Sequence, residues 1–244
     1  MHICIHEPGK YTMQEAPPDF KPNVSHDPNL DRLKTHPDAL GKRLWNPDAG
    51  PVYWKMETDY PHIEGRKLER KAIKLAFLQA SLLTSLVIRE KRRGTADAEI
   101  IINWFDDKAE PIFKTNPGYL AFAYGPGAGI GGDITMNASR IWTLHGKPIT
   151  AIEAFEAGII TGYSNATNRL RTWDSQHTLT HEGGHTFGCP HLLGCPKCVM
   201  YPWYNGQRIL QSEDQQQLWG FYEKSSYWRR AQLFLLARVL PGVI

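Results

Sequence analysis

The most informative part of the sequence is His181-Glu182-Gly183-Gly184-His185-Thr186-Phe187-Gly188-Cys189-Pro190-His191. His181 and His185 are four residues apart, so on a helix both imidazoles project from one face and can bind one metal ion. Gly188 can end that helix in a left-handed conformation, after which the chain turns back and His191 can supply a third nitrogen. Three imidazoles with one open position are typical of a catalytic zinc site rather than of a closed structural one.

Glu182 follows the first histidine, where its carboxylate can reach a metal-bound water without binding the metal itself. Three histidines, a glutamate and a glycine at fixed places are far more specific than a bare His-Glu-x-x-His. The alternative to a metal site is a helix whose histidines only cap its ends or pack in the core. His177 lies one helical turn before His181. We interpret it as a histidine on the helix surface or one that supports the ligands, not as a fourth ligand.

The composition describes an ordinary globular protein. The chain has 244 residues, of which 41% are hydrophobic and 22% charged, and this excludes a wholly disordered or coiled-coil chain. A net charge of +3 without a stripe of Lys and Arg gives no support for nucleic-acid binding. No apolar run of about 18 residues predicts a membrane span. No leader pattern is present, so we expect cytoplasmic synthesis with release or assembly by another route, unless a leader has been removed.

Residues 1–46 differ from the rest of the chain in composition and in hydrophobic pattern. They are rich in proline with weak apolar periodicity, which predicts an irregular extension along the surface. At its start, His2, Cys4 and His6 alternate with isoleucines, so in a strand their side chains share one face. We expect an edge strand, a tail that docks a partner, or a segment that modulates the metal site.

Periodicity predicts an α/β domain over residues 47–244. The expected strands are 52–57, 86–88, 100–102 and 119–124. The expected helices are 64–83, 149–157, 173–187, 212–223 and 227–240. The glycine-rich stretch 125–133 predicts a tight irregular loop, and a nucleotide-binding loop is disfavoured because no Lys-Ser/Thr follows it.

A methionine shortly after the third histidine forms the Met-turn of metzincins. With Met200-Tyr201-Pro202, the histidine motif resembles the catalytic core of the matrixins, the matrix metalloproteinase family. The likeness covers roughly residues 52–223. It extends to a third strand at 98–104, an edge strand at 120–124, a glycine loop at 129–133, the segment 140–143 and a last helix at 210–222. An insertion at about 146–171 and the helix 227–240 have no counterpart in that family.

The resemblance implies a twisted, mostly parallel sheet with one antiparallel edge strand, packed on helices. A small C-terminal subdomain should close a cleft with the zinc helix. It also implies a zinc-dependent endopeptidase with Glu182 as general base. An extended substrate should lie along residues 119–124, beside Leu120 and Ala121. The pocket for the residue after the scissile bond should be formed by Tyr201, Pro202, Trp203 and Tyr204, and Asp214 should brace the Met-turn.

Two departures from the family concern metals. The positions of two histidine ligands to the family's second, structural zinc hold Phe122 and Thr135, so we expect that zinc to be missing. One calcium site is doubtful because Asn137 and Arg140 replace acidic residues. The other calcium site can be retained in this chain. The alternative is that the glycine loop at 129–133 binds no calcium and is stabilised by its own hydrogen bonds. The expected ligands of this calcium site are Glu99, Gly129, Gly131 and Asp133.

The cysteines allow a second comparison. Cys198-Val199-Met200 resembles the archaemetzincins, although the further downstream cysteines of those proteins are missing here. Three outcomes remain open for Cys189, Cys195 and Cys198. They can form one disulfide, join a small metal site with His2, Cys4 and His6, or stay as free thiols.

We therefore expect a zinc endopeptidase with a polypeptide substrate and no nucleic-acid or membrane partner. Two alternatives remain. The chain can be a metal-stabilised structural or binding component of a larger assembly, joined through the N-terminal extension. It can also be a zinc hydrolase that acts on a non-protein amide.

Overall fold

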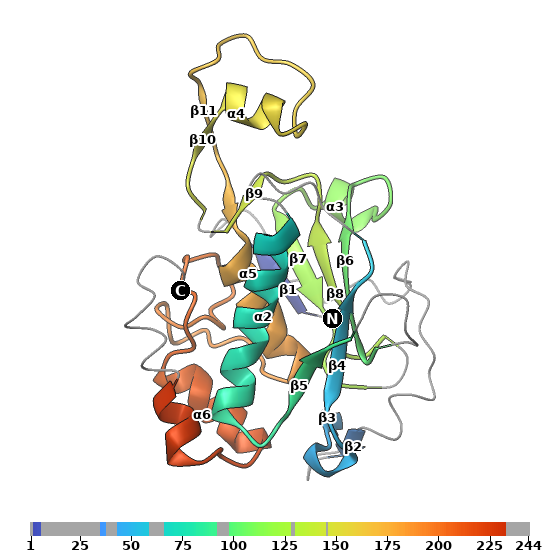
Figure 1. Ribbon diagram of the computed structural model, residues 1–244, viewed down its shortest axis with the longest axis vertical. Coiled ribbons are helices and arrows are strands. Elements are labelled where there is room, and N and C mark those ends of the chain that lie inside the picture. The colour runs from blue at the N-terminus through green and yellow to red at the C-terminus, as the bar shows by residue number, and fades with distance from the viewer. Residues whose placement is uncertain are drawn as a thin grey trace.

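A six-stranded sheet forms the centre of the protein (Figure 1). The computed structural model describes residues 2–5, 35–37, 43–58, 66–91, 98–127, 130–144 and 146–232. From one edge to the other, the sheet consists of β1 (His2–Ile5), β7 (Tyr119–Ala123), β8 (Ile134–Asn137), β6 (Ile100–Phe105), β4 (Val52–Met56) and β5 (Ile88–Glu90).

The strand directions confirm the predicted fold class. The pairs β4–β5, β4–β6 and β6–β8 are parallel, whereas β7 runs antiparallel to β8. Strand β1 pairs antiparallel with the other side of β7, so β7 is not the outermost strand of this sheet. The residues of β7 and most of those of β6 are buried, as expected for a sheet covered on both faces.

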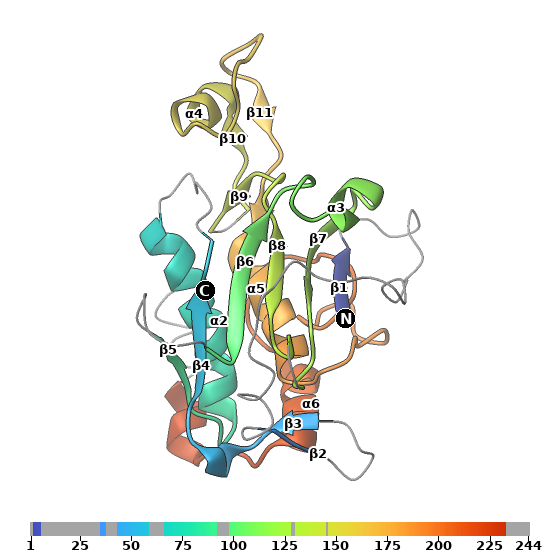
Figure 2. The same cartoon turned by 90° about the vertical axis from the view of Figure 1, so that its right-hand side faces the viewer.

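Two helices, α2 (Arg66–Leu83) and α5 (Ser175–Thr186), pack against each other on one face of the sheet (Figures 1 and 2). Phe77 of α2 contacts Trp54 and Phe187 with its ring edge-on at 5.9 and 5.7 Å between centroids. Helix α6 (Ser212–Phe221) packs on α2. The apolar core between these helices and the sheet fixes where the metal-binding motif lies.

Helix α5 begins and ends where its sequence allows. The Asp174 carboxylate accepts a hydrogen bond from the His177 N–H at 2.9 Å and caps the helix. The strand pair β9 (Trp142–Thr143) and β12 (Trp173–Asp174) takes up the first two residues of the predicted helix 173–187. At the other end Gly188 has φ +92°, the left-handed conformation expected for it.

The insertion projects from the body of the protein as a separate arm (Figures 1 and 2). It contains the antiparallel pair β10 (Ile149–Thr150) and β11 (Arg169–Leu170) and the short helix α4 (Ala151–Glu156). Thr150 and Glu153 form a capping box, which explains why the predicted helix starts two residues late. The rings of Phe155 and Tyr163 stack edge-on at 5.4 Å and are each about half exposed, at 45% and 43%.

Several short elements complete the described fold. β2 (Thr35–Pro37) pairs with β3 (Arg43–Trp45), and η1 (Pro47–Ala49) and α3 (Ile112–Thr115) are short helical turns. Trp45 is buried and its indole N–H donates to the Thr186 carbonyl at 2.8 Å, which fastens β3 to the end of α5. Residues 227–232 are helical, and the rest of the predicted helix 227–240 lies outside the described residues. No helix in the described ranges is long and apolar enough to cross a bilayer.

Candidate metal centre

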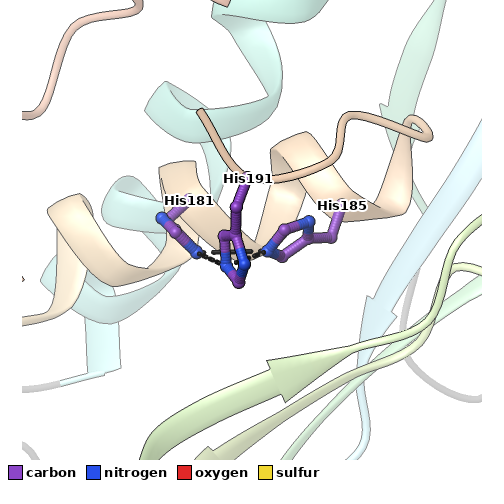
Figure 3. A group of neighbouring side chains, drawn as sticks. All are labelled: His181, His185 and His191. Atoms are coloured by element: carbon purple, nitrogen blue, oxygen red, sulfur yellow. Dashed lines mark hydrogen bonds between the residues drawn. The ribbon is translucent and has the colours of Figure 1, made fainter. Parts of the chain in front are cut away.

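Three imidazole rings meet where α5 faces the loop that follows it (Figure 3). His181 and His185 project from α5, and His191 lies on the loop. Their Nε2 atoms lie 3.1–3.2 Å from one another. Zinc binds imidazole nitrogen at about 2.0–2.1 Å, so one ion can reach all three nitrogens and keep a fourth position open. The donor set therefore fits a zinc ion.

Backbone carbonyl groups orient two of the rings. Nδ1 of His181 lies 2.6 Å from the Val199 oxygen, and Nδ1 of His185 lies 2.7 Å from the Cys189 oxygen. Because a carbonyl oxygen only accepts, each Nδ1 must carry the proton, which leaves the Nε2 lone pair for a metal. Burial lowers the pKa of His191 from 6.5 to about 4, so this ring is also neutral at pH 7. The tautomers of His181 and His185 and the neutral ring of His191 thus suit metal binding.

Met200 packs directly beneath the motif. A Cβ on Gly184 would meet the Met200 Sδ at 2.2 Å, a distance at which atoms overlap. Gly184 is therefore required because the Met-turn approaches the helix at that point. The carboxylate of Asp214 accepts hydrogen bonds at 3.0 Å from the N–H groups of both Val199 and Met200, and it is fully buried. This contact ties α6 to the turn that carries the Val199 carbonyl.

The matrixin family model matches residues 44–223, which is most of the chain and includes the triad and the turn. The chain belongs to the matrixin family. Matrixins are zinc-dependent endopeptidases, and in this matrixin the histidine triad is the donor set that fits the metal.

Curated relatives agree with this membership at low identity. Neutrophil collagenase of Homo sapiens is 29% identical over 196 residues, which cover 76% of this chain and 36% of the relative. Macrophage metalloelastase of Oryctolagus cuniculus is 27% identical over 177 residues, covering 72% and 32%. Matrilysin of Rattus norvegicus is 28% identical over 159 residues, covering 64% and 47%. This matrixin thus spans about a third to a half of the length of these relatives.

The other residues expected at the site lie around the triad. Glu182 is fully buried on α5, next to His181. Leu120 and Ala121 are buried in β7, which packs against α5. In the segment after Met200, Pro202 is buried, whereas Tyr201, Trp203 and Tyr204 are partly exposed. The rings of Tyr201 and Trp203 contact each other at 5.1 Å between centroids, and Trp203 also packs against a buried cluster that includes Phe113, Tyr119 and Phe122.

An aromatic cluster surrounds the position where the family's second zinc would need a histidine. Phe122 is fully buried and lies opposite Thr135 in the β7–β8 pair. Its ring contacts those of Phe113 and Tyr124 at 5.7 and 6.0 Å between centroids. A phenyl ring offers no donor atom to zinc, so we expect packing in place of a metal at this position.

We therefore predict one zinc ion per chain. Purified protein should contain close to one equivalent by elemental mass spectrometry, because among the described residues only the triad offers three nitrogen donors to one ion. Two tightly bound zinc ions per chain, with the second near Phe122, would contradict this expectation.

The structure describes some of the expected calcium ligands but not all of them. The Glu99 carboxylate accepts a hydrogen bond from the Tyr53 N–H at 2.7 Å, and the Asp133 carboxylate accepts one from the Ile101 N–H at 2.7 Å. Both carboxylates are buried. Gly129 lies outside the described residues. Calcium binding stays a prediction.

His177 was expected either on the helix surface or as a support for the ligands, and the first of these expectations is wrong. The residue is fully buried rather than on the helix surface. Its Nδ1 lies 2.5 Å from the Gln207 carbonyl oxygen, and its ring packs edge-on against Tyr204 at 4.7 Å. Burial lowers the pKa of His177 from 6.5 to about 4, so the ring is neutral at pH 7. The histidine thus anchors the 204–207 segment to α5, a role that the helical spacing alone did not reveal.

The buried His177 should make stability depend on pH. The unfolded chain binds a proton near pH 6.5 and the folded chain only near pH 4. The free energy of unfolding should therefore fall as the pH drops through this window, by on the order of 3 kcal/mol at its acid end. Chemical unfolding of wild type and His177→Gln between pH 4 and 7.5 measures this. The variant should lose less stability on acidification, and parallel curves would refute the assignment.

A disulfide joins Cys195 to Cys198 in the loop between His191 and Met200. This is the first of the three outcomes left open by the sequence. Cys189 is buried and is not part of a disulfide. Backbone hydrogen bonds from Leu192 to Met200 and from Cys195 to Leu192 hold the same loop, so the third ligand and the Met-turn share one small closed unit.

Proposed function

We propose that this chain hydrolyses internal peptide bonds, with His181, His185 and His191 holding a zinc ion and Glu182 acting as general base. The observation that carries the proposal is the triangle of Nε2 atoms 3.1–3.2 Å apart, with two of the rings oriented by backbone carbonyls. A closed structural site would need a fourth protein ligand, and within the part of the chain that the structure describes the group consists of three residues.

The triad and Glu182 have different roles in the proposed hydrolysis. A zinc ion at the triad supplies Lewis-acid chemistry, which acidifies water to a pKa of about 7 and polarises a carbonyl oxygen. Glu182 accepts a proton from the attacking water and passes it to the nitrogen of the leaving amine. Glu182 is buried on α5 and follows the ligand His181 directly, which supports this role.

The substrate that fits this arrangement is an extended polypeptide. Strand β7 packs against α5, so a peptide paired with its outer edge would pass beside the triad. Main-chain pairing suits any sequence, which agrees with an endopeptidase. We propose that the side chain after the scissile bond packs against the segment 201–204, near Leu120 and Ala121. The substrates in the relatives' names concern those proteins and do not extend to this chain.

Cleavage of a diverse peptide library by the zinc-loaded full chain tests the proposal, with products identified by mass spectrometry. We expect cleavage within peptides, its loss on chelation and its return on adding zinc. A parallel set of non-protein amides separates the alternative hydrolase. If zinc-loaded protein cleaves only those amides, or cleaves nothing, the endopeptidase proposal is wrong.

A further inference from the structure

Strand β1 occupies the outer edge of β7. The two strands are antiparallel, with His2 opposite Ala123, Ile3 opposite Phe122 and Cys4 opposite Ala121. The register then shifts, so that Ile5 lies opposite Tyr119 and Leu120 is passed over by an irregularity in the pairing. β1 also lies against α5, the helix that carries His181 and His185 (Figure 1).

This edge is the one on which the proposed substrate depends. β8 already covers the other side of β7, so β7 has a single row of backbone groups left for an added strand. Backbone pairing is exclusive, because each N–H and C=O in that row can serve one neighbouring strand at a time. β1 and an extended substrate therefore compete for the same hydrogen-bonding groups.

We propose that β1 is an internal competitor of the substrate, held on the substrate-binding edge of the chain's own active site. The proposal rests on the endopeptidase function argued above. A peptide can pair with β7 beside the triad only in molecules from which β1 has detached. A strand of four residues is a short element, so detachment is an equilibrium between two states of the same chain.

This competition has a specific kinetic signature. Apparent substrate affinity is reduced by the fraction of molecules with a free edge, while saturating substrate keeps β1 detached. KM should therefore be raised in the wild type, and kcat should be nearly unaffected. If about a tenth of the molecules or fewer have a free edge, releasing β1 should lower KM by about tenfold or more.

The test uses the full chain with two adjacent prolines, Ile3→Pro/Cys4→Pro. Proline lacks the N–H and disrupts strand pairing, and two neighbouring substitutions remove whichever of the two N–H groups faces β7. The matched control, Ile3→Val/Cys4→Ser, keeps both N–H groups and removes the thiol. We expect KM to fall by about tenfold or more in the proline variant, with kcat within about twofold, and no change in the control. An unchanged KM in the proline variant overturns the proposal, and so does equal activation of the control, which would locate the effect in the Cys4 thiol.

A binding measurement separates this proposal from the proposed function. Fluorescence anisotropy measures the affinity of each protein for a labelled peptide with the sequence of residues 1–6. The affinity of the proline variant should be at least about tenfold higher than that of the control. This experiment requires no cleavage. If no protein cleaves peptides but the labelled peptide binds only the proline variant, the endopeptidase function fails while β1 stands as a displaceable occupant of the edge. If the peptide binds both proteins equally, or neither, the proposal is overturned.

Discussion

Glu182→Gln should lose peptide cleavage by at least about a hundredfold while it keeps its zinc. A general base typically contributes on the order of 10²–10⁴-fold, and the amide cannot accept the proton of the attacking water. Gln has nearly the shape of Glu, so the packing of α5 and the positions of His181 and His185 should be preserved. The melting temperature should stay within about 3 °C of wild type. Initial rates, elemental analysis and thermal unfolding measure the three quantities.

The matched control for this variant is Glu156→Gln. Glu156 is an exposed glutamate at the end of α4 on the projecting arm, and the same substitution there should leave cleavage unchanged. If Glu182→Gln cleaves as fast as wild type, Glu182 is not the general base, even if the zinc site is real. If wild type cleaves nothing and matches Glu182→Gln in zinc content, the result favours the alternative that the chain is a metal-stabilised structural or binding component.

His185→Ala should lose both the zinc and stability. The substitution removes one of three metal ligands and also the ring held by the Cys189 carbonyl. A ligand that binds only the folded state stabilises it by about 2.7 kcal/mol when present at a hundred times its Kd. For a domain of this size the loss should lower the melting temperature by at least about 5 °C. Zinc content and thermal scans with and without added zinc measure the effect.

Two comparisons make the His185 result specific. Chelated wild type should melt close to His185→Ala, and only the wild type should regain stability when zinc is added. His177→Gln changes another buried histidine of α5 and should retain its zinc. The His177 ring lies beside that of His181, at 6.3 Å between centroids, but its Nδ1 pairs with the Gln207 carbonyl and it is not part of the group that can hold the metal. Full zinc retention by His185→Ala would show that its ring is not a ligand.

The triad was predictable because local geometry places its members. The spacing of His181 and His185 follows from the helical repeat, and Gly188 signals the left-handed turn that returns His191 to them. Helix α2 was equally accessible, since its apolar positions recur over five turns. These features depend on residues close together in the sequence.

Features that depend on distant segments were missed. Strand β8 has four residues, which give no clear alternation. An edge strand was one of the outcomes expected for β1, but its pairing with β7, more than a hundred residues away, was not predicted. The apolar run at 86–88 was predicted as a strand, whereas Leu86 is buried in a turn against Thr84 and the strand starts at Ile88. Gly184 carried a detectable signal, since a second glycine inside a helix lowers its stability and needs a reason in packing. That reason, the Met200 side chain, is visible only in three dimensions.

The bond between Cys195 and Cys198 affects how samples of this protein should be handled. Their sulfur atoms and the carboxylate of Glu213 lie within 4.8 Å of one another. In the oxidised chain the sulfurs are bonded to each other, but a thiol reductant in a purification buffer would free both. Thiolates with a carboxylate are good zinc donors, so the reductant would create a new zinc-binding group beside the Met-turn. Zinc measured in such a preparation would then include an ion that has no part in catalysis.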